Sequence, residues 1–329
     1  MEDNQEKQRK LLHDRGICVV IPTYNNGGTI AMVVRETLKE ISDVIVVNDG
    51  STDDTSKILH SIEGIAIVEY TKNRGKGYAL RKGFECALEM GFSYAITLDG
   101  DGQHYPSDIA LFLKENQKHP GALIIGSRQL IGVQRSKGSS FANQFSNFWF
   151  YIQTGRRLAD TQTGYRLYPL KKLHGLRLLT SRYEAELELI VFASWHGVEI
   201  VPIDIRVYYP PQEQRVSHFR PGKDFARISV LNMVLCFLAV VYGLPLRVYR
   251  GIANVLRTVY SLLFVLLACF CVITPSVWLY VKVGRMTERK RRNLHKLIYH
   301  ASRFVMLHHG IPGTTFNYKC SNKVNFSKP

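Results

Sequence analysis

Short apolar runs alternate with segments of helical periodicity through the first part of the chain. The runs are rich in valine and isoleucine and predict strands at 17–21, 44–47, 65–70, 94–98 and 123–125. The segments between them predict helices at 29–40, from about 52, at 77–90 and at 106–116. Buried strands that alternate with helices are typical of a mostly parallel sheet with helices on both faces. We therefore predict an α/β fold.

Beyond residue 132 the pattern is less regular. It predicts an aromatic-rich amphipathic segment at 141–151, a helix around 183–196 and a strand near 198–207. The aromatic side chains of 141–151 recur at near-helical spacing, which is typical of a helix that faces the core. A groove for a lipid chain is the alternative for that segment.

Two long stretches without charge follow, at 228–246 and 258–281. A helix of about 20 residues crosses the ~30 Å hydrocarbon core of a bilayer, so the second stretch is long enough to span it. The first contains Asn232, Gly243 and Pro245, and either spans the membrane or lies in its interface. Basic residues cluster outside the pair, which predicts that both ends face the cytoplasm.

These patterns divide the chain into four parts. We predict a polar N-terminal tail at 1–15, an α/β domain at 16–225, a membrane-embedded helical hairpin at 226–283 and a basic cytoplasmic tail at 284–329. The N-terminus is polar and charged, without the apolar core of a signal peptide. We expect a membrane protein whose α/β domain faces the cytoplasm.

The net charge of +16 raises the question of a nucleic-acid partner. Much of the excess lies beside the apolar stretches, which fits anionic lipid headgroups better than a groove for DNA. We therefore expect membrane lipids as partners, and no nucleic acid. The six cysteines are scattered without paired spacing for zinc, which indicates reduced thiols in a cytosol-facing domain.

Candidate chemistry is concentrated where the apolar strands end. Asp99 and Asp101 follow the run 94–98, and their side chains point the same way because strand side chains alternate with period two. Two carboxylates so close are unfavourable unless a cation lies between them, and an oxygen pair suits Mg²⁺ or Mn²⁺. A polar turn is the alternative. Other strands also end in polar residues, at one shared sheet edge: Asn25, Asn48–Asp49 and Ser127–Arg128.

A further segment suits phosphate groups. Arg74 and Lys76 lie among glycines at the start of a predicted helix, where backbone N–H groups and positive charge favour anions. The segment 49–54 also opens a helix, and simple helix capping is the alternative there.

Six segments of the chain form a set that is more specific than any one of them. They are Ile21-Pro22-Thr23-Tyr24-Asn25-Asn26, Val47-Asn48-Asp49-Gly50-Ser51-Thr52-Asp53, Asn73-Arg74-Gly75-Lys76-Gly77, Leu98-Asp99-Gly100-Asp101-Gly102-Gln103-His104, Gly126-Ser127-Arg128 and Thr163-Gly164-Tyr165-Arg166. In this order, over roughly residues 16–220, the chain resembles the family-2 glycosyltransferases. Within them it resembles the dolichyl- or polyprenyl-phosphate mannose and glucose synthases.

The resemblance implies a Rossmann-like GT-A fold, a nucleotide-sugar donor and inversion at the anomeric carbon. It assigns substrate binding to a set of residues: Pro22, Tyr24, Asn26, Asp49, Lys76, Arg215 and Ser217. It assigns the metal ion, Mg²⁺ or Mn²⁺, to Asp99, Asp101 and Gln103. Many relatives carry an acidic residue at the position of Asn26, so the identity of the nucleotide stays open.

The catalytic candidates are Asp101, Arg128, Asp160 and Arg166. A divalent ion and Arg128 would stabilise the departing nucleoside diphosphate. A lipid phosphate is already anionic at neutral pH and needs no protein base, whereas a hydroxyl acceptor needs one. Asp160 is the candidate base, with loop capping as the alternative. Arg166 is an acceptor clamp or a structural ion-pair partner.

Three acids follow a helical pattern, and we expect two of them to be solvated and assign a role to none: Glu184, Glu186 and Glu188. The tail from 291 onward resembles the lead-in of lysophospholipid acyltransferase domains, some of which are fused to family-2 glycosyltransferases, although their His-x4-Asp motif is absent. That resemblance implies an acyltransferase partner; an ordinary basic amphipathic tail is the alternative.

Taken together, these features predict a membrane-anchored, inverting glycosyltransferase. It would move a hexose from a nucleotide sugar to a polyprenyl phosphate or another lipid-linked acceptor. A transferase acting on a lipid or glycan hydroxyl is one alternative, and an inactive, glycosyltransferase-like membrane scaffold is another.

Overall fold

The computed structural model describes residues 2–128, 137–176, 178–208, 221–259 and 261–263. The chain divides into two compact units, Met1–Ala253 and Asn254–Pro329. Only a few residues of the second unit are described, so the fold below is that of the first.

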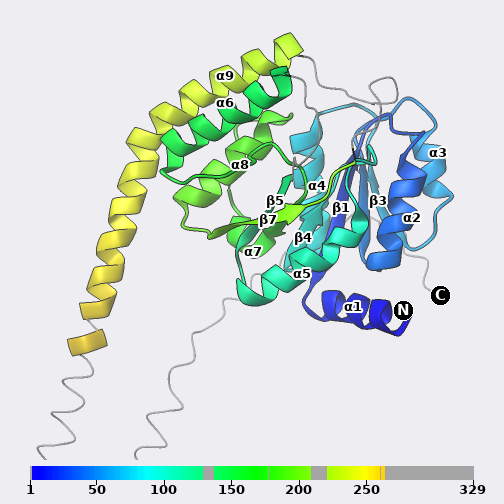
Figure 1. Cartoon of the computed structure of the whole chain (residues 1–329), viewed down its shortest axis with the longest axis horizontal. Helices are drawn as coiled ribbons and strands as arrows, with labels where there is room; N and C mark the ends of the chain where they lie inside the picture. The colour runs from blue at the N-terminus through cyan, green and yellow to red at the C-terminus, as the bar shows by residue number, and fades with distance from the viewer. Residues whose placement is uncertain (1, 129–136, 177, 209–220, 260, 264–329) are drawn as a thin grey trace, which may run out of the picture. The chain divides into compact units, whose positions relative to one another are not determined.

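A seven-stranded sheet forms the centre of this unit (Figure 1). Its strands are β1 (Ile17–Thr23), β2 (Val44–Asn48), β3 (Ile65–Glu69), β4 (Tyr94–Thr97), β5 (Leu123–Arg128), β6 (Arg166–Pro169) and β7 (Ile200–Ile205), in the order β3-β2-β1-β4-β6-β5-β7. Only β6 runs antiparallel to its neighbours, β4 and β5. The predicted α/β fold with a mostly parallel sheet is therefore confirmed, and β6 is a strand that the apolar pattern did not predict.

Helices cover both faces of the sheet, as predicted. They are α1 (Glu2–Asp14), α2 (Ile30–Glu40), α3 (Thr55–His60), α4 (Lys76–Glu89), α5 (Ile109–Lys118), α6 (Lys137–Thr154), α7 (Leu170–Leu173), α8 (Glu184–Trp195) and α9 (Pro221–Leu238). A one-turn 3₁₀ helix, Pro106–Asp108, leads into α5.

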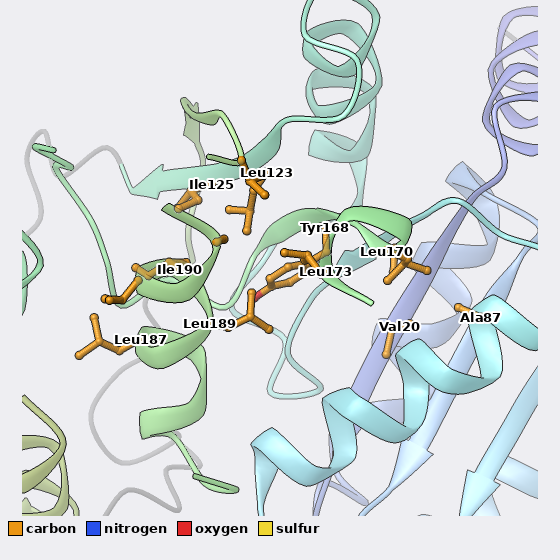
Figure 2. Close-up of a cluster of buried hydrophobic side chains, with 14 of the residues drawn as sticks. Val20, Ala87, Leu123, Ile125, Tyr168, Leu170, Leu173, Leu187, Leu189 and Ile190 are labelled. Carbon is orange, nitrogen blue, oxygen red and sulfur yellow. The ribbon is translucent and has the colours of Figure 1, made fainter. Parts of the chain in front are cut away.

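Successive side chains of each strand point to opposite faces of the sheet and pack into two separate apolar cores. Val20 of β1 packs in one core with residues of α4, α7 and α8, and Figure 2 shows this cluster around Tyr168 and Ile190. Val19 and Ile21 point to the opposite face and pack with residues of α2 and α5. This alternation is why continuous Val and Ile runs fold as strands that are buried on both sides.

Residues 2–14, expected as a polar tail, form α1. Its Leu12 is fully buried in the second core, and the Arg9 guanidinium donates hydrogen bonds to the Lys39 carbonyl. The segment thus packs as part of the α/β domain. A single buried leucine among charged residues gave too weak a periodic signal to predict this.

One described helix, Asp224–Leu263, is long and apolar enough to cross a membrane. It includes α9 from Asp224 onward and a π-helical turn at Ala239–Gly243, and it stays helical through 244–259. A hairpin requires a turn between the two predicted apolar stretches, and residues 247–257, which join them, are helical in the described structure. Residues 264–283 of the expected hairpin, and the tail at 284–329, lie outside the described residues.

Candidate active site

The loops that follow β1 and β2 are joined at the carboxyl edge of the sheet. Asn25, whose φ of 51° lies in the left-handed region, accepts a hydrogen bond from the Thr52 N–H at 2.8 Å through its side-chain oxygen. Its own N–H donates to the Ser51 hydroxyl at 2.9 Å. Pro22 is buried at the end of β1 and Tyr24 is partly buried just beyond it. The edge that the sequence predicted is thus formed by contacts between separate loops.

Asn26 is buried between these loops. Its N–H donates to the Thr55 hydroxyl at 3.1 Å, and its side-chain amide donates to Thr23 at 3.1 Å. The side-chain oxygen is buried and has no hydrogen-bond partner within the described structure. A buried acceptor of this kind is costly unless a donor reaches it.

Asp49 fixes the start of α4. Its two carboxylate oxygens accept hydrogen bonds from the Arg74 and Gly75 N–H groups, each at 2.8 Å. Gly75 has φ of 98°, and a Cβ there would lie 2.6 Å from Arg182, so only glycine fits. Asp49 therefore fixes Gly75, and with it the following residue Lys76, at the sheet edge.

Lys76 is held between two carboxylates from different parts of the chain. Its Nζ lies 2.7 Å from Asp99 Oδ1 and 2.9 Å from Glu186 Oε2. Burial opposes the charged form of Lys76, but the two carboxylates outweigh it and raise its pKa. Burial likewise opposes ionisation of Asp99, and Lys76 overcomes it and lowers the pKa of that carboxyl. A Cβ on Gly164 would lie 2.7 Å from both Asp99 Oδ2 and Lys76 Nζ.

Asp101 lies in the same loop without a cationic side chain in contact. Its carboxylate accepts a hydrogen bond from the Gln103 N–H at 3.0 Å, and no ion pair of Asp101 occurs among the residues described. Burial, and then the negative charge of Asp99, raise the pKa of Asp101 to about 6. The loop is thus short of positive charge at this carboxylate.

The donor set of this loop fits a hard divalent cation. Asp99, Asp101 and Gln103 offer oxygen atoms within five residues of one loop. The described part of the chain holds no cluster of three or more His, Cys, Asp or Glu side chains suited to a metal. Mg²⁺ commonly takes one or two protein carboxylates and completes its shell with waters and substrate phosphates, so a smaller set is sufficient.

His104 is buried next to this loop. Burial lowers its pKa to about 4, so the ring is neutral at pH 7. Its Nε2 lies 3.9 Å from Asp99 Oδ2, and its ring packs 5.0 Å from that of Tyr165. Its Nδ1 has no hydrogen-bond partner among the described atoms.

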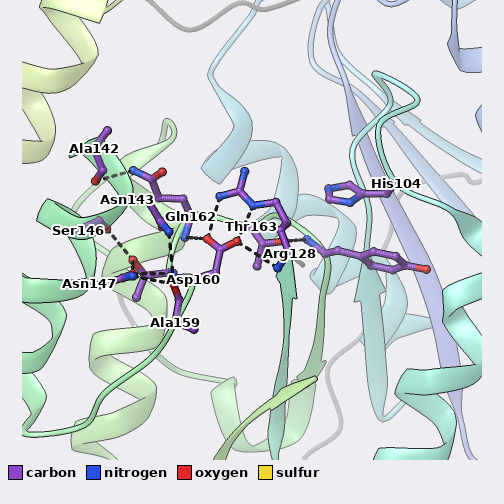
Figure 3. Close-up of polar contacts among 12 residues, drawn as sticks. His104, Arg128, Ala142, Asn143, Ser146, Asn147, Ala159, Asp160, Gln162 and Thr163 are labelled. Atoms are coloured by element: carbon purple, nitrogen blue, oxygen red, sulfur yellow. Dashed lines mark hydrogen bonds and ion pairs between the residues drawn. The ribbon is translucent and has the colours of Figure 1, made fainter. Parts of the chain in front are cut away.

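Arg128, at the end of β5, forms a two-pronged ion pair with Asp160 (Figure 3). Nε donates to Oδ2 at 2.5 Å and Nη2 to Oδ1 at 2.8 Å. Burial opposes ionisation of Asp160, but Arg128 overcomes it and lowers the pKa of the carboxyl. A carboxylate bound in this way is a weak proton acceptor, and its effect is to orient the guanidinium.

The loop that carries Asp160 is supported by α6. Side-chain amides of Asn143 and Asn147 donate to the Ala159 carbonyl, and the Thr161 hydroxyl donates to Ser146 at 2.8 Å (Figure 3). The predicted aromatic helix therefore also presents a polar row that holds the site loop.

Arg166 lies behind this loop. It is fully buried, and its guanidinium donates to the carbonyls of Thr161, Thr163 and Glu186 at 2.7–2.9 Å. Of the two roles left open for Arg166, these contacts match a structural one, although the partners are backbone carbonyls and no ion pair of Arg166 occurs in the described structure.

The acids of α8 differ from expectation, because all three are buried. Glu186 binds Lys76, and Glu188 accepts hydrogen bonds from the N–H groups of Leu179 and Thr180. The expectation that two of them are solvated was wrong. Glu184 and Glu188, at i and i+4, share one side of α8, and Glu186 lies on the other. The sequence offers no sign of which element covers each side. Arg215 and Ser217 lie outside the described residues.

Comparisons with known proteins agree with this geometry. The model of glycosyl transferase family 2 matches residues 18–168. The chain is 32% identical over 213 residues to an uncharacterised protein of Methanocaldococcus jannaschii, covering 62% of this chain and 86% of that protein. It is 28% identical over 245 residues to the UDP-N-acetylglucosamine–dolichyl-phosphate N-acetylglucosaminyltransferase of Methanococcus voltae, covering 67% and 97%.

A solved structure supports the fold. Glucosyl-3-phosphoglycerate synthase from Mycobacterium tuberculosis, in complex with Mn²⁺, UDP and glucosyl-3-phosphoglycerate, superposes with a TM-score of 0.54. The identity is 18%, over 71% of this chain and 83% of that one. This likeness confirms the predicted GT-A fold.

Proposed function

Because the chain belongs to glycosyl transferase family 2, we propose that it transfers a hexose from a nucleotide sugar to a polyprenyl phosphate at a membrane surface. The observation that carries this proposal is the pair of charged groups at one sheet edge. Lys76 with Asp99 and Asp101 suits the donor diphosphate, and Arg128, oriented by Asp160, suits a second phosphate.

On the donor side, Asp99, Asp101 and Gln103 would hold Mg²⁺ or Mn²⁺. The ion supplies charge stabilisation to the departing nucleoside diphosphate. Lys76 neutralises Asp99 and keeps the loop in place, and the loops around Tyr24, Asn26 and Asp49 would receive the nucleoside. The unpartnered Asn26 oxygen supports a donor group from the base as its partner.

On the acceptor side, the state of Asp160 favours a phosphate. A hydroxyl acceptor needs a base, and Asp160 is held as a paired carboxylate with a lowered pKa. A phosphate acceptor is already anionic and needs only to be oriented. Arg128 provides a guanidinium of fixed geometry for it. Attack on the face opposite the leaving group would invert the anomeric carbon.

The outer faces of α6 and α9 support attachment to a membrane. The two helices lie side by side in Figure 1 and pack on each other. The inward residues Leu231 and Leu235 are buried, whereas Met233 is 72% and Phe237 66% exposed. We infer that this part of the helix lies in the bilayer interface against the domain, with the domain on the cytoplasmic side.

Transfer by the full chain in detergent tests the proposal. Nucleotide sugars would be screened with a polyprenyl phosphate and with the matching polyprenol, with mass spectrometry of the product. We expect a metal-dependent glycosyl phosphate product and none from the alcohol. A product from the alcohol alone would favour the hydroxyl acceptor, and no turnover of any donor would favour an inactive scaffold.

A further inference from the structure

Four arginines gather at the C-terminal end of α6, where the chain leads into the Asp160 loop. Arg247 donates hydrogen bonds to the Thr154 carbonyl at 2.8 Å and the Gln153 carbonyl at 3.1 Å, and Arg250 donates to the Trp195 carbonyl. Arg156 and Arg157 follow α6 after Gly155 and are exposed, and Arg156 Nη1 donates to the Val198 carbonyl at 3.3 Å. No carboxylate pairs with any of the four in the described part of the chain.

Arg156 and Arg157 line a cavity. Its volume is about 360 Å³, and its other lining residues are apolar: Phe150, Leu158, Ile200 and Pro202. The Arg157 guanidinium also lies 5.1 Å from the centre of the Tyr151 ring. Two arginines and four apolar residues therefore line one small cavity, a combination that suits a negative head group attached to an apolar body.

The cavity adjoins the surface assigned to the membrane. Tyr151 and Ile152, in the last turn of α6, and Val248 and Tyr249, next to Arg247, are exposed apolar or aromatic side chains. Phospholipid phosphates lie just outside the hydrocarbon region, where basic side chains beside an apolar face meet them. Leu158 of the lining lies two residues before Asp160, so the cavity borders the loop that orients Arg128. In the described structure, no hydrogen bond or ion pair joins Arg156 or Arg157 to Arg128 or Asp160.

We propose that Arg156 and Arg157 bind the phosphate of an anionic membrane phospholipid, with its glycerol and upper acyl region against the apolar residues of the lining. The inference rests on the membrane attachment proposed above. Its physical basis is that these four arginines contact only backbone carbonyls or an aromatic ring, and no carboxylate, within the described residues. The bound lipid would fix the rotation and depth of α6, and with it the height of the Asp160 loop.

The test titrates the full chain in detergent with dioctanoyl phosphatidylglycerol, dioctanoyl phosphatidylcholine and inorganic phosphate, with native mass spectrometry as the measurement. We expect one phosphatidylglycerol to bind at least tenfold more tightly than the other two. The double variant R156Q/R157Q should weaken it about 30-fold, since each basic residue near a lipid surface contributes about fivefold. The control K171Q/K172Q removes the same charge from the exposed side of α7 and should change binding less than twofold.

Three outcomes would overturn the inference. Equal losses in both double variants would mean diffuse charge attraction. Equal binding of inorganic phosphate would mean an anion site without a lipid. Competition by a short-chain polyprenyl phosphate would make the cavity part of the acceptor path. Transfer activity, measured in the same detergent, separates this proposal from the previous one: a wild type that binds phosphatidylglycerol but transfers no sugar refutes only the proposed function.

Discussion

Charged side chains at the sheet edge and at the C-terminal end of α6 differ in burial and in their partners. At the edge, Lys76 and Arg128 are nearly buried and each is matched by carboxylates. At the end of α6, Arg156 and Arg157 are exposed and have no acidic partner within the described structure. A buried charge is costly unless the protein itself supplies a partner. An exposed charge is solvated by water and remains available to a ligand.

The largest loss of activity is expected at Asp101, the edge carboxylate that has no cationic partner among the described residues. Asp101→Asn removes the charge that would draw a divalent ion, so transfer should fall about 10³-fold, and chelation of metal should have the same effect on the wild type. Steady-state rates with added Mn²⁺ measure it. Asp54→Asn, an exposed acid at the start of α3, is the control and should keep activity. Full turnover by the Asp101 variant would refute the metal assignment.

Asp160→Asn is the next largest effect. The substitution weakens the ion pair that orients Arg128, and a misplaced binding group costs about 100-fold in rate. With a phosphate acceptor, the loss should be uniform across neutral pH, and the acceptor KM should rise. If the substitution instead removes the acidic limb of the pH–rate profile, which a general base sets, and leaves the acceptor KM unchanged, then Asp160 takes the proton.

Glu186→Gln tests a residue that the sequence did not single out. Lys76 keeps Asp99 but loses its second carboxylate, and the weaker hydrogen bond to the amide should cost about 2 kcal/mol of the free energy of unfolding, or about 4–8 °C in Tm. Apparent metal affinity should fall about tenfold, because Lys76 then binds Asp99 alone. Glu184→Gln on the same helix is the matched control, since Glu184 makes no ion pair in the described residues. Equal effects of the two variants would contradict the assigned role.

The two exposed arginines at the end of α6 are expected to affect transfer least. R156Q/R157Q should change transfer in detergent less than twofold, because neither arginine contacts the edge. The same assay and short-chain acceptor measure it. A tenfold loss would place these arginines in the reaction path.

The strand ends and their polar residues were predictable because Val and Ile runs fix both the strands and the edge where they stop. β6 was not, since its four residues become a strand only by pairing with β4 and β5, which are distant from it in the sequence. The same limit applies to Glu186 and Asp160. Their spacing is local, but the cations that define their roles come from α4 and β5, and only the folded chain brings these together.

Gly164 places a steric constraint on the site, in addition to the electrostatic ones. The space where any other residue would carry its first side-chain carbon is filled by an ammonium nitrogen and a carboxylate oxygen. Even a methyl group must therefore push the two apart or lift the 161–164 segment. If the proposed function holds, an acceptor that displaced this segment would therefore also displace Lys76 and Asp99 on the donor side.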